Sequence, residues 1–103
     1  MATVYISGPI SGDPNYKEKF RKAEEALKDL HLIPSNPATN PNNLTYRQYI
    51  DAGLQQLSNC DMILMLPGWE HSKGARLEHA YAETVGMPIL RSEIDHGGKL
   101  YIY

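Results

Sequence analysis

The sequence feature that most constrains the fold is a continuous apolar run at residues 62–66, Met-Ile-Leu-Met-Leu. Pro67 and Gly68 follow the run directly and end it. A short run without polar residues is typical of a central parallel strand that is buried on both faces. Parallel neighbours need long crossover connections, which are usually helices. The run therefore predicts a domain in which strands and helices alternate.

The residues before this run alternate between strand and helix patterns. Residues 3–6, Thr-Val-Tyr-Ile, favour a strand, and a glycine- and proline-rich turn at 8–12 ends it. Apolar residues recur at spacings of three and four over residues 16–30, which predicts an amphipathic helix. Residues 31–34 form a weak second strand interrupted by Pro34, and the Asn- and Pro-rich residues 36–43 predict an irregular loop.

The remaining segments continue the alternation. Thr45 and Gln48 match a capping box, and the second helix has an expected buried stripe of Tyr46, Tyr49, Ile50, Leu54 and Leu57. A third helix is predicted to end near Gly86, and residues 87–90 favour a fourth strand. Residues 97–103 could form a fifth strand at the edge of the sheet or dock on a partner. The order predicts a three-layer α/β fold, a flavodoxin-like doubly wound parallel sheet of four or five strands, in one domain spanning residues 1–103.

The charge and the residue composition exclude several classes of binding partner and cofactor. The 103 residues carry a formal net charge of −2, so no basic surface is expected for nucleic acid or an anionic membrane. No apolar segment approaches the length of a membrane span, and the first residues lack the pattern of a secretory signal. Cys60 is the only cysteine, and the four histidines show no metal-ligand spacing. We expect a cytoplasmic protein that uses no metal or cofactor.

Glu78 is the residue whose position is hardest to explain by packing alone. At about 100° per residue, Ala75, Tyr81, Ala82 and Val85 lie within about 60° of Glu78 on the third helix, so a carboxylate occupies the small, apolar face. Burying an unpaired carboxylate is costly, so a structural Glu78 needs a cation or several donors nearby. The same placement suits a catalytic carboxylate at the wall of a cleft. Either interpretation is compatible with the sequence.

Other candidate residues lie where a ligand would be expected, beyond the carboxyl ends of the strands. The turn at 8–12 has neither the phosphate-loop nor the Rossmann glycine signature. Ser72 and Gly74 open the third helix and could cap it or bind an anion. Trp69 could stack on a planar base or serve as a packing residue. Asp51 borders the apolar stripe of the second helix and, taken alone, would be interpreted as a solvated residue.

Three motifs together resemble the nucleoside 2-deoxyribosyltransferase superfamily. Its subgroup of 2′-deoxynucleoside 5′-monophosphate N-hydrolases, with small relatives in bacteria and phages, is similar too. Residues 5–12, Tyr-Ile-Ser-Gly-Pro-Ile-Ser-Gly, resemble the opening strand and turn of the family. Asp51 matches the helix acid that precedes the central strand, and residues 72–78 match a Ser-x-Gly-x-x-x-Glu signature. The resemblance extends over about residues 3–91.

This resemblance implies a reaction and catalytic roles. Glu78 would be the nucleophile at the anomeric carbon, Asp51 the acid that assists the departing base, and Tyr5 a neighbour that orients the carboxylate. Cleavage of an N-glycosidic bond passes through an oxocarbenium-like state that a carboxylate can stabilise or trap. Water as the acceptor of the sugar would make the enzyme a hydrolase, and another base would make it a transferase.

The resemblance also implies a substrate site and a partner. By the resemblance, Ser72 and Gly74 would hold the 5′ end of a nucleoside or its phosphate. The full set of expected substrate-binding residues adds the first turn and the loop before the third helix: Gly8, Pro9, Ile10, Ser72, Gly74 and Trp69. The hydrolase subgroup has an Arg in the first turn where this chain has Ser11, which leaves phosphate recognition open. Relatives share active sites across subunits, so a homo-oligomer is expected. The alternatives are a protein that binds a nucleotide or an NAD-derived metabolite without catalysis, and a structural or partner-binding protein.

Overall fold

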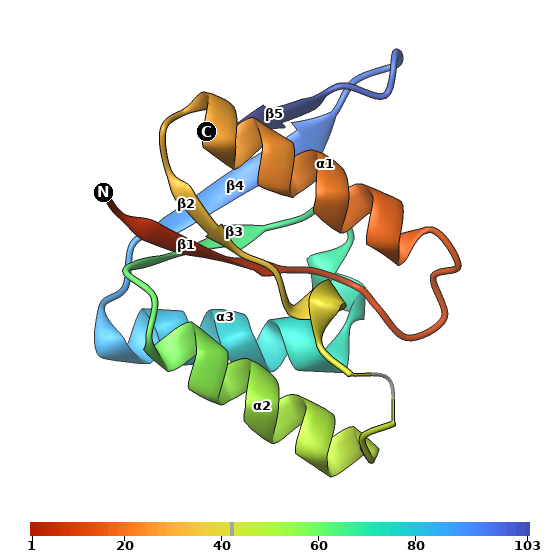
Figure 1. Ribbon diagram of the computed structural model, residues 1–103, viewed down its shortest axis with the longest axis vertical. Coiled ribbons are helices and arrows are strands. Elements are labelled where there is room, and N and C mark those ends of the chain that lie inside the picture. The colour runs from red at the N-terminus through yellow and green to blue at the C-terminus, as the bar shows by residue number, and fades with distance from the viewer. Residues whose placement is uncertain (42) are drawn as a thin grey trace.

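Strands and helices alternate along the chain in the computed structural model, which describes residues 1–41 and 43–103 (Figure 1). The strands are β1 (Thr3–Ser7), β2 (Ile33–Ser35), β3 (Met62–Met65), β4 (Ile89–Ile94) and β5 (Leu100–Ile102). The α-helices are α1 (Tyr16–Asp29), α2 (Tyr46–Ser58) and α3 (Lys73–Val85), and the 3-10 helices are η1 (Pro37–Thr39) and η2 (Trp69–His71). Asn42, in the loop predicted at 36–43, lies outside the described residues.

The strands form one sheet in the order β2-β1-β3-β4-β5. The first four are parallel, which confirms the predicted doubly wound sheet with residues 62–65 at its centre. The predicted edge strand is present as β5, and it runs antiparallel to β4. Only residues 95–99 separate the two strands, which is too few for the crossover that a parallel pair requires.

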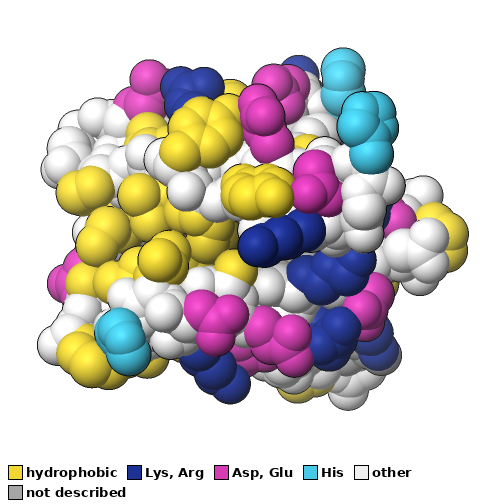
Figure 2. All heavy atoms as spheres, turned by 90° about the horizontal axis from the view of Figure 1, so that it is seen from above, with side chains coloured by type: hydrophobic (Ala, Val, Ile, Leu, Met, Phe, Trp, Pro, Cys, Tyr) yellow, Lys and Arg dark blue, Asp and Glu magenta, His cyan; other side chains and the backbone are white. Residues whose placement is uncertain are grey.

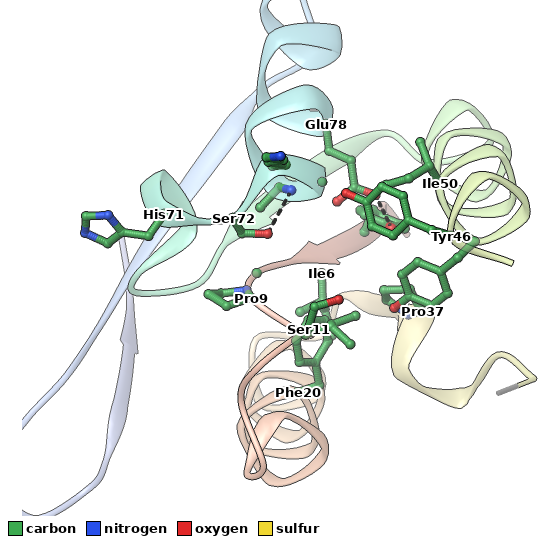
Figure 3. A pocket seen from close by; sticks show the side chains of 17 residues that line it. Ile6, Pro9, Ser11, Phe20, Pro37, Tyr46, Ile50, His71, Ser72 and Glu78 are labelled. Carbon is green, nitrogen blue, oxygen red and sulfur yellow. Dashed lines mark hydrogen bonds between the residues drawn. The ribbon is translucent and has the colours of Figure 1, made fainter. Parts of the chain in front are cut away.

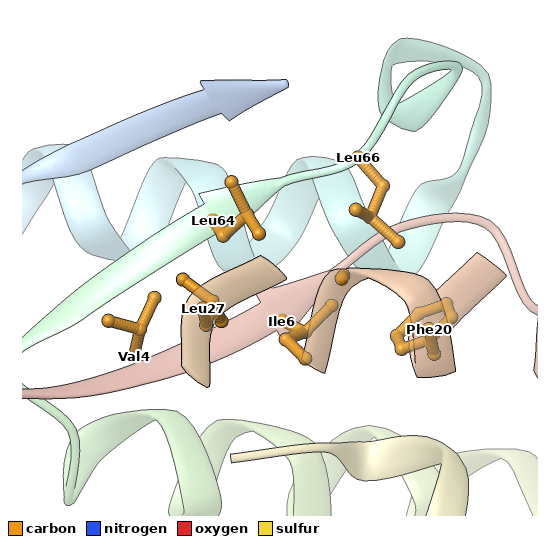
Figure 4. Packing of buried hydrophobic residues seen from close by; sticks show 7 residues of the cluster. Val4, Ile6, Phe20, Leu27, Leu64 and Leu66 are labelled. Carbon is orange, nitrogen blue, oxygen red and sulfur yellow. The ribbon is translucent and has the colours of Figure 1, made fainter. Parts of the chain in front are cut away.

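Each face of the sheet has its own buried cluster, because successive side chains of a strand point to opposite faces. In Figure 1, α1 covers one face, and α2 and α3 cover the other. The cluster beneath α1 consists of Val4, Ile6, Phe20, Ala23, Leu27, Leu64 and Leu66 (Figure 4). The opposite cluster consists of Tyr5, Leu57, Ile63, Met65, Ala75 and Ala82. Strand β3 contributes to both clusters, as its uninterrupted apolar sequence predicts.

The face that carries α1 is only partly covered. A helix is about 10–12 Å wide, whereas five strands spaced about 4.8 Å apart form a wider surface. Leu32, Met62, Leu90 and Ile102 pack against the margin of the cluster beneath α1 and remain partly exposed. Seen from above, hydrophobic side chains gather on one part of the surface and charged side chains crowd another (Figure 2).

The ends of the helices depart from the predicted apolar stripes. Tyr46, in the first turn of α2, is 59% exposed, and Val85, at the end of α3, is 54% exposed. Both residues lie in the terminal turns of their helices. Ala75 and Ala82 are buried, so the face of α3 that carries Glu78 does point inward. Each helix within residues 1–41 and 43–103 is too short and too polar to cross a lipid bilayer.

Candidate active site

A cavity of about 250 Å³ lies beyond the carboxyl ends of β1 and β3. The chain leaves β1 toward α1 on one face of the sheet and leaves β3 toward α3 on the other, so the connections diverge here. Such a switch point is where open parallel sheets usually bind ligands. Figure 3 shows side chains from several elements converging on this cavity. The lining residues are Tyr5, Ile6, Gly8, Pro9, Ile10, Ser11, Phe20, Pro37, Tyr46, Tyr49, Ile50, His71, Ser72, Lys73, Gly74, Ala75 and Glu78.

The carboxylate of Glu78 is held by two hydroxyl groups of β1. The Tyr5 hydroxyl donates a hydrogen bond of 2.5 Å to Oε2, and the Ser7 hydroxyl donates one of 2.7 Å to Oε1. Tyr5 and Ser7 are two residues apart on a strand, so their side chains share one face. Both residues are buried in the protein. The orientation of the carboxylate is therefore set by a strand of the core.

Glu78 has hydrogen-bond donors but lacks a partner cation. Among the described residues, no Lys, Arg or His nitrogen lies within 4.0 Å of its carboxylate. Burial raises the pKa of Glu78, and the hydrogen bonds from Tyr5 and Ser7 partly offset that rise. Burial and the Glu78 charge raise the pKa of Tyr5 far above its ordinary value, so the proton of this hydrogen bond stays on the phenol. A partly buried carboxylate with a perturbed pKa at a cavity wall is typical of a functional site.

Two glycines allow the backbone to approach this carboxylate and the cavity closely. A Cβ atom at Gly53 of α2 would lie 2.9 Å from Oε2 of Glu78 and 3.1 Å from the Tyr5 hydroxyl. A Cβ atom at Gly8 would lie 2.8 Å from Cβ of Leu66, where the turn after β1 passes the end of β3. A side chain at Gly53 would displace the ends of Glu78 and Tyr5, and one at Gly8 would press on the Leu66 side chain.

The first residues of α3 form the other side of the cavity. The Ser72 side chain accepts a hydrogen bond of 3.3 Å from the Ala75 amide and so caps the helix. The positive end of the helix dipole lies here, and Lys73 adds a charged side chain at the exposed rim. This part of the cavity suits an anionic group such as a phosphate.

Tyr49 of α2 contributes a polar group that the sequence pattern assigned to the buried stripe. Its hydroxyl oxygen is buried and has no hydrogen-bond partner among the described residues. Burial, followed by the charge of Glu78, raises the pKa of Tyr49 to about 12. Unpaired buried hydroxyls are rare in folded proteins, and this one belongs to a residue that lines the cavity. A shift of the Tyr49 ring would be needed before this oxygen could bond a ligand in the cavity.

Comparison with known proteins places this chain in a family. Residues 2–91 match the family described as Domain of unknown function (DUF4406). The chain belongs to that family. Among the curated proteins, none matches its sequence.

Solved structures with the same fold include two named as deoxyribosyltransferases. The 2-deoxyribosyltransferase of Leishmania mexicana is 20% identical, with a TM-score of 0.70 over 98% of this chain and 79% of that one. The enzyme of Bacillus psychrosaccharolyticus is 17% identical, with a TM-score of 0.67 over 87% and 71%. A conserved protein of Enterococcus faecalis V583 is 17% identical, with a TM-score of 0.70 over 93% and 65%. The deoxyribosyltransferase-like fold implied by the three motifs is thus confirmed.

The structure brings most of the predicted site residues of this DUF4406 domain together. Those that line the cavity are Tyr5, Gly8, Pro9, Ile10, Ser72, Gly74 and Glu78. Asp51 is exposed and is not among the lining residues. Trp69 is not among them either, because its ring stacks on His79 with the centroids 4.2 Å apart.

Three residues of the site were not predicted as functional. Tyr49, which lines the cavity, was assigned to packing, and Ser7 and Gly53, which contact Glu78, were not considered for the site. A signal for Ser7 was present, because a residue two positions after Tyr5 must share its face of the strand. Within the described part of the chain, no three His, Cys, Asp or Glu side chains are grouped as they would be to hold a metal ion.

Proposed function

We propose that this protein cleaves or transfers at the N-glycosidic bond of a nucleoside or nucleotide, with Glu78 as the nucleophile. The observation that carries the proposal is the carboxylate of Glu78, which faces a cavity, is oriented by two hydroxyl donors and has no ion-pair partner among the described residues. The deoxyribosyltransferase-like fold supports the same class of reaction.

The proposed reaction uses Glu78 in two steps. An oxygen of its carboxylate attacks the anomeric carbon, a C–O bond forms, and the C–N bond to the base breaks. Water or a second base then takes the sugar and releases the carboxylate, as in retaining glycosidases. Tyr5 and Ser7 keep the carboxylate in one orientation, which reduces the entropy that must be lost to reach the transition state.

The start of α3 is the proposed site for the 5′ end of the substrate. Gly74 leaves room beside the helix terminus, and Lys73 supplies a positive charge at the rim. The turn at Gly8, Pro9 and Ile10 would border the sugar or base. Asp51 and Trp69 would need to act from outside the cavity lining, and their roles stay predictions.

A release assay with a substrate panel tests the proposal. The protein would be incubated with ribo- and deoxyribonucleosides, their 5′-monophosphates and NAD, and free base would be measured. Glu78→Gln should abolish release, whereas Glu83→Gln, on an exposed residue of the same helix, should retain it. A ligand that raises the melting temperature without any release of base would identify a binding protein and overturn the proposal.

A further inference from the structure

The cavity holds a single acidic side chain. Among the described residues that line it, Glu78 alone carries a carboxyl group. Retaining glycosidases use a second carboxyl group to protonate the leaving group. Asp51, which the motif resemblance assigned to this task, lies on the exposed side of α2.

The α2 residue that lies nearest to the Glu78 carboxylate cannot be the acid, because it is a glycine. Gly53 is the α2 residue that meets Glu78, and even a Cβ atom there would lie 2.9 Å from Oε2. The α2 residues that do line the cavity are Tyr46, Tyr49 and Ile50, and none of them is a carboxylic acid. The α2 wall opposite Glu78 is therefore apolar or phenolic.

The other proton donors of the cavity are poorly suited to the task. The Tyr5 proton is engaged with Glu78, and the Tyr49 phenol has a pKa of about 12, so it is a weak acid at neutral pH. His71 and Lys73 are exposed at the rim. In Figure 3 the His71 ring lies beyond Ser72 and points away from Glu78.

The charge of the leaving base decides whether an acid is needed. When the C–N bond breaks, its electron pair moves to the base nitrogen. A neutral base would then leave as an anion. Protonation of the departing base by a general acid avoids this and typically speeds the reaction by about 10²–10⁴-fold. A base that already carries a positive charge departs as a neutral molecule and requires no proton.

We propose, on the basis of the function proposed above, that the preferred substrates of this site are N-glycosides whose base is cationic, such as an N-alkylated purine or a pyridinium. A Glu78 oxygen forms the bond to the anomeric carbon, and the C–N electron pair neutralises the departing base. Water then attacks the same carbon, regenerates the carboxylate and gives its proton to solvent. A carboxylate without a partner cation also attracts a cationic base to the cavity.

Guanosine and 7-methylguanosine form a matched pair for the test, because a methyl group and the charge it confers distinguish them. Both would be assayed as ribosides and 2′-deoxyribosides, with nicotinamide riboside as the pyridinium probe. Each kcat/KM would be divided by the uncatalysed rate of the same compound at the same pH. This division removes the greater intrinsic lability of the cationic compound.

We expect the protein to accelerate cleavage of 7-methylguanosine at least as strongly as that of guanosine, since a general acid would favour guanosine by about 10²-fold or more. A larger acceleration for guanosine would overturn the inference and leave the proposed function intact. Release of base from none of the panel would overturn both. In Asp51→Asn, the ratio of the two accelerations, guanosine to 7-methylguanosine, should match that of the unsubstituted protein. A loss of activity on guanosine alone would identify Asp51 as the acid and reject the inference.

Discussion

The phenol of Tyr5 donates a 2.5 Å hydrogen bond to Glu78 and thereby joins the first strand to the third helix, although 73 positions separate the two residues. Ser7 reaches the second carboxylate oxygen from the same face of the strand. Both oxygens of the carboxylate are therefore held by β1.

Replacing Glu78 should change how stability depends on pH. Its folded pKa lies above the ordinary value of 4.5, so stability from this group is complete below 4.5 and is lost as pH rises through the folded pKa. Glu78→Gln cannot ionise, so it removes this loss of stability at higher pH, and its amide oxygen can still accept a hydrogen bond from a hydroxyl group of β1. The variant should therefore melt at a temperature equal to or above that of the unsubstituted protein at pH 7.

Thermal melts from pH 4 to pH 8 would check this, with Glu83→Gln as the control. The difference in melting temperature between Glu78→Gln and the unsubstituted protein should grow in favour of the variant as pH rises. A loss of about 3–5 kcal/mol at neutral pH would contradict this prediction and indicate that the charged carboxylate has a structural role. Glu78→Ala is a poorer test, because it leaves the Tyr5 and Ser7 hydroxyls without an acceptor at about 1–3 kcal/mol each.

Tyr5→Phe should raise the pKa of Glu78 further, because the hydrogen bond from Tyr5 lowers it. A nucleophile acts in its ionised form, so the acidic limb of the pH–rate profile should move to higher pH, by about one unit for each 1.4 kcal/mol lost. Tyr81→Phe, on a partly buried tyrosine of the same cluster, is the control and should leave the limb in place. An unchanged limb in Tyr5→Phe would contradict the orienting role.

Gly53→Ala should reduce activity with little cost to folding. Alanine favours a helix over glycine by about 1 kcal/mol, and the new Cβ atom would press on the flexible ends of Glu78 and Tyr5. A displacement of about 1 Å at a reacting group can cost about 10²-fold in rate. Gln55→Ala, at an exposed position of the same helix, should be neutral in both assays. Full activity in Gly53→Ala would show that the close approach is unimportant.

Tyr49→Phe should separate binding from stability. Its buried hydroxyl has no partner among the described residues, and leaving such a group unpaired costs about 1–3 kcal/mol. The variant should therefore unfold at the same or a higher denaturant concentration, while KM rises roughly tenfold if the hydroxyl bonds the substrate. Tyr16→Phe, outside the cavity lining, serves as the control. Lower stability with unchanged KM would contradict the prediction.

Self-association is expected through the exposed edge of the sheet at β5. Strand β5 is an edge strand, and Tyr101 and Tyr103 are 49% and 62% exposed. An open edge with apolar side chains favours pairing with another chain. Sedimentation velocity at micromolar concentration should show a dimer that Tyr101→Lys weakens. A monomer that retains full activity would count against this prediction.

The sheet could be predicted because its decisive signal is local. The apolar run of β3 has no polar position that could face solvent, so it predicts a strand buried on both faces without knowledge of its neighbours. Strand β4 extends beyond the predicted residues 87–90 to Ile94, because Ser92, Glu93 and Ile94 pair with β5. That pairing depends on a turn and a partner strand, which the pattern of β4 alone does not contain.

The site could be predicted in part. Helical periodicity placed Glu78 on the inner face of α3, and strand alternation would have placed Ser7 beside Tyr5. The angular position of Asp51, about 100° from Ile50, left it at a border, and only the packing of α2 turns it to solvent. The close approach at Gly53 and the unpaired Tyr49 hydroxyl arise from contacts between elements, which no single segment encodes.

Strand β1 has a consequence for how this family can vary over generations. Tyr5 and Ser7 hold the carboxylate, while Val4 and Ile6, on the opposite face of the same strand, lie in the cluster beneath α1. Close-packed interiors transmit displacements, so a changed side chain at Val4 or Ile6 would move the two hydroxyls. Substitutions at Val4 or Ile6 that the fold could tolerate would then be eliminated because they lower catalytic activity. The sequence of β1 should therefore vary less among relatives than that of other buried strands.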